Sequence, residues 1–351
     1  MSTFAQIDKN FKVETKIQKE DIVFYDTKNA PFKIYGVFFE GDRYRRMPES
    51  VAKEVSNGVY QLHTNTAGGR VRFMTDSPYI AISAKMPSLH KMPHFAFSGS
   101  IGLDLYVTVD GEERFFEGYI PPFEVEDGYE GIVDFETAEM RECTINFPLY
   151  SDLSDLYIGV SRDAQILPAS DYKDIKPIVA YGSSITQGAC ASRPGNCYEA
   201  IITRRLGVDH INLGFSGNAM GEETIARYIA SLDMSAFVYD YDHNSSDAAY
   251  LDRTHERMFK IIREAHPDLP ILILSRPKCR LIEEEKKRLE VVRATYRHAV
   301  EAGDKNVYFI AGSDLMALCG DNGVVDRCHP SDLGFFSMAK AIGDALEKIL
   351  L

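Results

Sequence analysis

The sequence predicts two domains of different class, an all-β sandwich followed by an α/β domain built on a parallel sheet. The chain has 351 residues, which is more than one hydrophobic core usually spans. Short alternating runs separated by turn residues fill residues 32–160, whereas apolar strands alternate with amphipathic helices from residue 177 onward. We expect the sandwich domain to cover residues 1–165 and the α/β domain to cover residues 166–351.

The first half contains eight or nine short strand-like runs, at a spacing typical of a jelly-roll-like sandwich. The clearest hairpin signal is Asp110-Gly111, which separates the runs 103–109 and 114–119. The other predicted strands are 32–39, 59–64, 70–75, 79–84, 132–135, 142–147 and 156–160, and no helix of any length is predicted among them. Residues 161–177 are polar and broken by prolines, which indicates a linker.

Five β-then-α units make up the second half. The predicted strands are 178–181, 210–214, 236–240, 269–274 and 307–310, and the predicted helices are 197–206, 222–232, 250–265, 283–302 and 331–350. Repeated units of this kind imply a parallel sheet covered by helices on both faces, with right-handed crossovers. Open α/β sheets carry their chemistry at the carboxyl ends of the strands, so the loops that follow the strands are the places to search.

Ser184 is a candidate nucleophile. It follows a buried-type strand, at a Gly182-Ser183-Ser184 turn where a strand hands over to a helix. The free N–H groups at the start of that helix would favour developing negative charge. A Gly-Ser-Ser turn by itself more often caps a helix, so the assignment depends on the other loops.

Three later loops supply what ester hydrolysis by a serine requires. His329 is a candidate base, and Asp326, three residues earlier, can hold its imidazole in the correct tautomer. Gly217 can offer a backbone N–H and Asn244 a side-chain N–H to the oxyanion, together with the N–H of Ser184 itself. Each motif alone can be a turn or a helix cap, but four such loops at strand ends together predict a serine hydrolase.

On these residues the second domain resembles the SGNH hydrolases, also called the GDSL esterase superfamily, over residues 177–351. That family is named for a serine, a glycine, an asparagine and a histidine in four separate blocks. The matching residues are Ser184, Gly217, Asn244 and, in the last block, Asp326 with His329. The resemblance implies a flavodoxin-like, three-layer hydrolase domain. The sequence departs from the usual pattern at Ser183 (Asp), at Ile185 (Leu) and in the third block, which reads Asp-His-Asn-Ser and not Gly-x-Asn-Asp.

A Gly-Ser-Ser-Ile-Thr-Gln-Gly variant behind a β-sandwich is similar to the two-domain subgroup that contains carbohydrate esterases and some acyltransferases. This implies a serine esterase that removes a short acyl group, with acetyl as the first expectation, from a carbohydrate or similar hydroxylated molecule. The reaction would proceed through an acyl-enzyme and use no metal or organic cofactor. Two alternatives stay open: an acyltransferase with the same acyl-enzyme, and a carbohydrate-binding protein without the chemistry. The α/β-hydrolase fold is disfavoured, because no Gly-x-Ser-x-Gly elbow is found.

An irregular loop at residues 87–97 of the first domain holds two histidines, a methionine and two phenylalanines. Its ordinary interpretation is a cover for the sandwich. Its functional interpretation is a loop that leans over the second domain and contacts substrate through His90 and His94. Metal binding by these two histidines is disfavoured, because no carboxylate lies beside them in the sequence.

Net charge narrows the class of partner, and cysteine usage narrows the cellular compartment. A net charge of −13 argues against nucleic acid or an anionic membrane and leaves neutral sugar esters open. Residues 1–10 lack a signal-peptide apolar run, and no stretch reaches the roughly 18 apolar residues of a membrane span. Six cysteines without a Cys-x-x-Cys pair predict mostly buried thiols in a reducing compartment. We expect a cytoplasmic protein that acts on a small-molecule ester, and its oligomeric state stays open.

Overall fold

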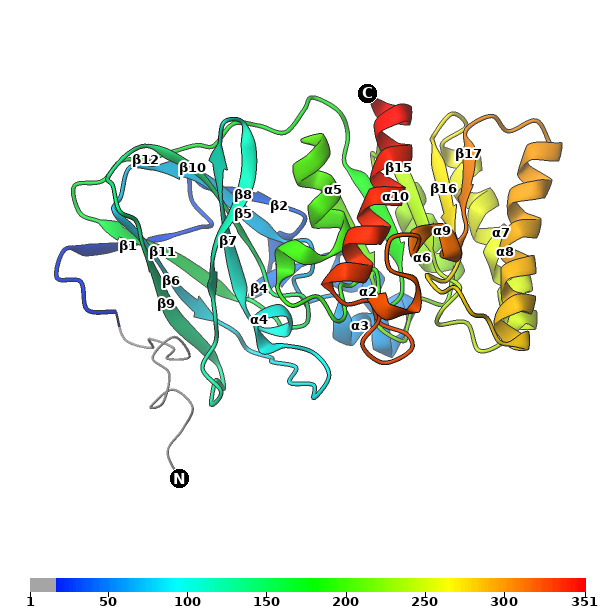
Figure 1. Cartoon of the computed structure of the whole chain (residues 1–351), viewed down its shortest axis with the longest axis horizontal. Helices are drawn as coiled ribbons and strands as arrows, with labels where there is room; N and C mark the ends of the chain where they lie inside the picture. The colour runs from blue at the N-terminus through cyan, green and yellow to red at the C-terminus, as the bar shows by residue number, and fades with distance from the viewer. Residues whose placement is uncertain (1–16) are drawn as a thin grey trace.

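The computed structural model describes residues 17–351 and divides them into the two predicted classes of structure (Figure 1). An antiparallel β region forms the N-terminal half, and an α/β domain lies beside it along the long axis of the molecule. The predicted fold class is therefore confirmed. Each helix within residues 17–351 is too short or too polar to cross a lipid bilayer. The cytoplasmic location and the domain boundary at residue 165 stay predictions.

Two antiparallel sheets make up most of the first half. One has the order β1-β11-β6-β9, with bounds Ile22–Asp26, Asp155–Ser161, Tyr79–Lys85 and Gly128–Asp134. The other has the order β12-β5-β10-β7-β8, with bounds Ile166–Leu167, Arg70–Thr75, Arg141–Asn146, Leu103–Val109 and Glu112–Tyr119, and β2 (Lys33–Tyr35) also pairs with β5. A separate pair joins β3 (Phe38–Glu40) to β4 (Arg43–Arg45). Inward-facing residues of the two large sheets, such as Phe73 and Ile82, share one core.

The hairpin predicted at Asp110-Gly111 is confirmed. It joins β7 to β8, and its two central residues have φ angles of 55° and 80°. A two-residue type I′ turn requires positive φ at both positions, which asparagine, aspartate and glycine tolerate. The Asp110-Gly111 pair therefore predicted the correct pairing of β7 with β8.

The strand predicted at residues 59–64 is wrong. Residues 59–62 belong to helix α3 (Asn57–Leu62), which follows helix α2 (Glu49–Val55), and residues 63–64 form a turn. The short helix α4 (Phe97–Ser100) comes later in the same half. Ser56 Oγ caps α3 by accepting a hydrogen bond from Val59 N at 3.2 Å. Ala52 and Val59 are buried in a core that belongs mainly to the α/β domain, where α2 and α3 lie (Figure 1). Burial against a distant domain thus decided a conformation that local alternation did not reveal.

The α/β domain carries a five-stranded parallel sheet of order β14-β13-β15-β16-β17, which is the flavodoxin-like order 2-1-3-4-5. The strand bounds are His210–Gly214, Ile178–Gly182, Ala236–Asp240, Ile271–Leu274 and Val307–Ile310. Helices α5 (Tyr198–Leu206) and α10 (Asp332–Leu350) cover one face, and α6 (Glu223–Ala230), α7 (Ala248–Ala265) and α8 (Glu283–Glu301) cover the other. Helix α9 (Gly312–Leu315) and two 3-10 turns, η2 (Pro194–Asn196) and η3 (Gly320–Gly323), lie in connecting loops. Strands β13, β15 and β16 are buried along their whole length, which explains why their sequences are rich in apolar residues.

A buried carboxylate joins the two halves. Asp104 on β7 is fully buried, and its Oδ2 accepts hydrogen bonds from Gly195 N at 2.8 Å and Arg193 Nη1 at 3.3 Å. Its Oδ1 accepts a hydrogen bond from Asn146 Nδ2 at 2.8 Å, within the sandwich. A Cβ at Gly195 would lie 2.5 Å from the ring of Tyr106, so the glycine allows the two domains to approach this closely.

Candidate active site

Ser184 lies in the turn after β13, at the carboxyl edge of the sheet, as the sequence predicts. Gly182 ends the strand at a point where a Cβ would lie 2.1 Å from the carbonyl oxygen of Asp240 on β15. Glycine therefore allows the central strands to stay paired up to the nucleophile turn. The expected helix directly behind Ser184 is a single turn, because α5 begins only at Tyr198.

Ser184, His329 and Asp326 form a continuous chain of hydrogen bonds. Ser184 Oγ lies 2.9 Å from His329 Nε2, and His329 Nδ1 lies 2.8 Å from Asp326 Oδ2. Ser184 is 7% exposed, so most of the residue is buried. This geometry allows the hydroxyl to lose its proton to the imidazole as the oxygen attacks an ester carbonyl.

Asp326 is held as a carboxylate by the loop that carries the histidine. Its Oδ1 accepts hydrogen bonds from the backbone N–H groups of Cys328 at 3.1 Å and His329 at 2.9 Å. Partial burial raises the pKa of Asp326, but hydrogen bonds from the backbone and side chain of His329 outweigh it and lower the pKa to about 2. An ionised carboxylate can only accept, so the proton belongs on His329 Nδ1, and Nε2 stays available as the base.

Two backbone N–H groups are available beside the nucleophile. Within residues 17–351, the N–H groups of Ser184 and Gly217 have no hydrogen-bond acceptor, whereas Ser216 and Asn218, on either side of Gly217, both donate to acceptors in the protein. Gly217 has a φ of 69°, and a Cβ there would meet nothing within 4 Å. The glycine is thus required for its left-handed conformation, and it borders open space where an oxyanion could lie.

Asn244 follows β15 and completes the set of predicted donors. Its Oδ1 accepts a hydrogen bond from Ala219 N at 3.3 Å, which leaves the amide nitrogen as the donor end. Arg288 holds the same loop by donating to the carbonyl oxygen of Ser245 at 2.8 Å. His243 is half-buried, and loss of solvation lowers its pKa well below the usual range. Its Nδ1 lies 3.7 Å from Cys328 Sγ, in the loop that carries His329 (the base loop). The structure therefore brings all five predicted residues of the hydrolase site to one edge of the sheet.

Gln187 connects the nucleophile turn to the Gly217 loop and to the first domain. Its Oε1 accepts a hydrogen bond from Ser216 N at 2.9 Å. Its Nε2 donates to Asn65 Oδ1 at 3.1 Å and to the carbonyl oxygen of Leu149 at 3.3 Å. Gln187 and Asn65 are both fully buried. Sequence reasoning missed this residue, although it stands out as a polar side chain in the motif that carries the serine.

Arg46 of the first domain supports the same loop from another side. Its Nη1 donates to the carbonyl oxygen of Gly214 at 2.5 Å and its Nη2 to that of Leu62 at 2.7 Å. The guanidinium carbon lies 4.8 Å from the centre of the Phe215 ring. Burial lowers the pKa of Arg46 to about 10, so the side chain stays charged at neutral pH. The segment that leads from β14 to Gly217 is thus positioned by a buried cation.

The loop at residues 87–97 reaches the hydrolase site, and His94 lies beside the acid. His94 Nε2 lies 3.7 Å from Asp326 Oδ2, and the ring centres of His94 and His329 are 5.8 Å apart. Phe95 is buried in a core cluster shared with the α/β domain. The loop therefore leans over the second domain, and a role of His94 in binding substrate stays a prediction.

His90 comes earlier in the same loop than His94 and lies where two cavities meet. One cavity, of about 400 Å³, lies between helix α3, the loop around His90, and Ser216 and Asn218 beside Gly217. The other, of about 610 Å³, shares His90 and Gln61 with the first and extends to Arg43 and other charged residues of the first domain. Both domains thus line a cleft that leads away from the Gly217 loop.

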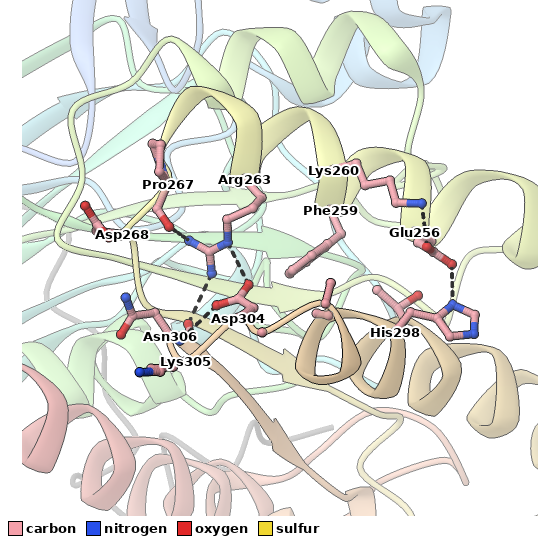
Figure 2. Close-up of a pocket in the computed structure, with 14 residues that line it drawn as sticks. Glu256, Phe259, Lys260, Arg263, Pro267, Asp268, His298, Asp304, Lys305 and Asn306 are labelled. Atoms are coloured by element: carbon pink, nitrogen blue, oxygen red, sulfur yellow. Dashed lines mark hydrogen bonds and ion pairs between the residues drawn. The ribbon is translucent and has the colours of Figure 1, made fainter.

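A further cavity, of about 630 Å³, lies between α7 and α8 (Figure 2). It borders Asp304 and Asn306, which precede β17, so it opens at the amino ends of the strands, opposite Ser184. Arg263 in this cavity is already paired with Asp304 Oδ2 at 2.8 Å and with the carbonyl oxygen of Leu269 at 2.6 Å. We therefore assign it no part in the chemistry at Ser184.

Two family models match the two halves of the chain. Residues 175–350 match the GDSL-like lipase/acylhydrolase family, and residues 22–166 match the family described as the N-terminus of Esterase_SGNH_hydro-type, or GxDLY. The chain belongs to the GDSL-like lipase/acylhydrolase family. The predicted SGNH resemblance, the two-domain layout and an enzyme of the esterase class are thereby confirmed for this GDSL-like protein. Residues 102–106 read Gly-Leu-Asp-Leu-Tyr, so the GxDLY letters include the interface residues Asp104 and Tyr106.

Solved structures share the whole two-domain arrangement. A candidate GDSL-like lipase from Bacteroides ovatus is 34% identical, with a TM-score of 0.84, over 94% of this chain and 98% of that one. A salicylyl-acyltransferase from a tetracycline biosynthetic pathway is 19% identical, with a TM-score of 0.73, over 95% and 99% of the two chains. An acetyl xylan esterase from the rumen bacterium Butyrivibrio proteoclasticus is 11% identical, with a TM-score of 0.60, over 93% and 98%. The last two likenesses concern the fold alone. No curated protein sequence matches this chain.

Proposed function

We propose that this GDSL-like enzyme hydrolyses a short-chain acyl ester of a carbohydrate or similar hydroxylated small molecule, and that the acyl group is acetyl. The observation that supports it most is the chain Ser184 Oγ–His329 Nε2 and His329 Nδ1–Asp326 Oδ2, at 2.9 and 2.8 Å. The second requirement of acyl transfer is a set of hydrogen-bond donors for the oxyanion. The N–H groups of Ser184 and Gly217, which have no acceptor within residues 17–351, can supply it. No metal or organic cofactor is needed for the reaction.

The reaction begins when Ser184 Oγ attacks the ester carbonyl and His329 Nε2 takes the hydroxyl proton. The carbonyl oxygen becomes an oxyanion that accepts hydrogen bonds from Ser184 N, Gly217 N and the Asn244 amide. The carbonyl re-forms as the alcohol leaves with the proton from His329, and an acyl-enzyme remains. Water then repeats the sequence and releases the acid, while Asp326 stays ionised and balances the imidazolium charge.

The cleft around His90 is proposed to hold the alcohol part of the substrate. Its walls mix donors and acceptors, including Arg43, Glu49 and Asp152, which suits the hydroxyl groups of a neutral sugar. Tyr60, which lines this cavity, is 37% exposed and offers an aromatic surface. Replacing His90 by alanine should raise KM for an acetylated oligosaccharide and leave kcat on p-nitrophenyl acetate unchanged. An equal effect on both substrates would contradict this assignment.

An acyltransferase with the same acyl-enzyme is the second candidate. The burial of Ser184 favours it, because limited water access lets an acceptor alcohol compete for the acyl group. Product analysis with and without candidate sugar acceptors separates the two. Free acid as the product under both conditions would exclude transfer.

The first experiment is hydrolysis of p-nitrophenyl esters from acetate to octanoate by the native enzyme and by Ser184→Ala. We expect activity on the short esters that is lost in the variant, with an unchanged circular dichroism spectrum. Equal activity of the two proteins would refute the proposal. If the native enzyme hydrolyses none of the esters, labelling by a fluorophosphonate probe distinguishes a selective enzyme from a catalytically silent binding protein.

A further inference from the structure

Three side chains that ligate metal ions meet beside the proposed active site. Ligand atoms of His94, Cys190 and His329 all lie within 4.8 Å of one another. They come from three separate segments: the first-domain loop, the segment after the nucleophile turn, and the base loop that precedes α10. His94 has a side chain that is 40% exposed, so the cluster opens to solvent on that side, whereas Cys190 is buried.

We propose that this cluster binds zinc, or a divalent cation of similar softness, and that the bound cation reversibly inhibits the enzyme. Two imidazoles and a thiolate are a preferred donor set for zinc. The inhibitory part of this inference rests on the proposed function, whereas the binding part depends on the three side chains alone. The cation is a regulator of the site and has no role in hydrolysis.

The geometry needs only a small adjustment. Zinc bonds of roughly 2.0–2.3 Å in a tetrahedral arrangement place ligand atoms roughly 3.3–3.6 Å apart. The three atoms therefore have to approach one another by at most about 1.5 Å, from separations within 4.8 Å. The exposed side chain of His94 can supply most of this movement. Asp326 Oδ2, 3.7 Å from His94 Nε2, lies near enough to act as a fourth, anionic ligand.

The cation would inhibit the enzyme whether Nε2 or Nδ1 of His329 coordinates it. Nε2 contacts Ser184 Oγ, so a cation there occupies the lone pair that must accept the hydroxyl proton. Nδ1 contacts Asp326 Oδ2, so a cation there displaces the proton and the carboxylate contact that orient the ring. In both cases the imidazole can no longer serve as the base.

Binding has to release a proton. Burial raises the pKa of the Cys190 thiol to about 12, so the sulfur is protonated in the metal-free protein. When the Zn–S bond forms, the S–H bond breaks and its proton passes to solvent. A cation held by all three side chains would join the first-domain loop of His94 to the base loop, so zinc should raise the melting temperature.

Binding is tested in the Ser184→Ala background, which keeps all three ligands and does not depend on turnover. Calorimetric titration with zinc chloride should give one site per chain, and cobalt(II) should give the near-ultraviolet band of a thiolate ligand. Cys190→Ser in that background should weaken zinc binding at least tenfold and remove the cobalt band. The matched control is Cys279→Ser, which removes an exposed thiol elsewhere and should change neither readout.

Inhibition is tested in the enzyme with its serine intact. Zinc should suppress ester hydrolysis by the native protein, whereas Cys190→Ser should retain basal hydrolysis and need at least ten times more zinc. Unchanged zinc binding in both Cys190→Ser and His94→Ala would overturn the site. Equal zinc sensitivity of the native and Cys190→Ser enzymes would overturn the inhibitory role. Tight zinc binding by a protein that hydrolyses no ester would instead contradict the proposed function and leave the metal site standing.

Discussion

Gln187 offers a sharp test of whether the first domain positions the catalytic groups. Replacing it by methionine keeps its volume and removes both of its hydrogen-bonding ends. Three buried groups then lose a partner: Ser216 N, Asn65 Oδ1 and the carbonyl oxygen of Leu149. At a lower-limit cost of about 1 kcal/mol each, the free energy of unfolding should fall by about 3 kcal/mol. We expect the melting temperature to decrease by several degrees.

The effect on catalysis should be larger than the loss of stability alone explains. The hydrogen bond from Ser216 N to Gln187 Oε1 fixes the backbone next to Gly217, whose N–H is a proposed oxyanion donor. One oxyanion donor contributes about 3 kcal/mol to the barrier, or roughly a hundredfold in kcat, and a displaced donor loses part of that. We expect Gln187→Met to lower kcat on p-nitrophenyl acetate by about 10- to 100-fold, with KM changed less than threefold.

Asn65→Ala is the matched control for this variant. It removes a buried hydrogen bond to Gln187 Nε2 and leaves the bond between Gln187 Oε1 and Ser216 N in place. It should therefore lower the melting temperature but keep kcat within about threefold of the native value. Both enzymes are assayed well below their melting temperatures. If Gln187→Met keeps native kcat, or if the two variants lose kcat equally, Gln187 does not act through the Gly217 loop.

Four further predictions concern the acid, the oxyanion amide and the interface. Asp326→Asn should lower kcat about 10³- to 10⁴-fold without unfolding, since the amide favours the wrong imidazole tautomer; native kcat would refute the role. Because the pKa of Asp326 is lowered, its ionised carboxylate stabilises the folded protein fully above the ordinary pKa of about 4, and this stabilisation is lost as pH falls towards 2. The urea midpoints of the native and Asp326→Asn proteins should therefore converge in that pH range. Asn244→Ala should lower kcat about 10²- to 10³-fold with KM nearly unchanged, and a change confined to KM would argue against an oxyanion role. Asp104→Ala leaves Gly195 N and Arg193 without their buried acceptor, so it should lower stability by about 3 kcal/mol and expose the segment between the domains to limited proteolysis; native protease resistance would refute it.

The sheet and the main site residues could be predicted because both follow from local rules. Strands buried on two faces are rich in apolar residues, as in β13 and β15. The predicted strands 210–214, 236–240 and 307–310 coincide with β14, β15 and β17. Parallel strands place their carboxyl ends at one edge, so loops far apart in the sequence, such as those of Ser184 and His329, are brought together by topology. The prediction of chemistry required only that the strands be found.

The parts that could not be predicted depend on contacts between the domains. Arg46 lies in an Arg-Tyr-Arg-Arg run that is typical of a solvated edge, yet its partner Gly214 is 168 residues away and buried. Gln187 meets Asn65 across 122 residues. The run 59–64 has the alternation of a strand, but burial of Val59 in the core of the second domain selects a helix. No local pattern encodes which distant surface will cover a residue.

The first domain contacts three parts of the proposed machinery, the nucleophile turn, the segment before Gly217 and the acid. Tyr150 Oη donates to the carbonyl oxygen of Ser184 at 3.2 Å, in the nucleophile turn. Arg46 holds the loop that leads to Gly217, and His94 lies beside the acid Asp326. A hydrolase domain without these contacts would keep the serine, acid and base in its sequence but lose the groups that fix their spacing. Because the same first-domain segments also line the cleft, substitutions in them can change the accepted alcohol while the hydrogen-bond chain from Ser184 to Asp326 stays as it is.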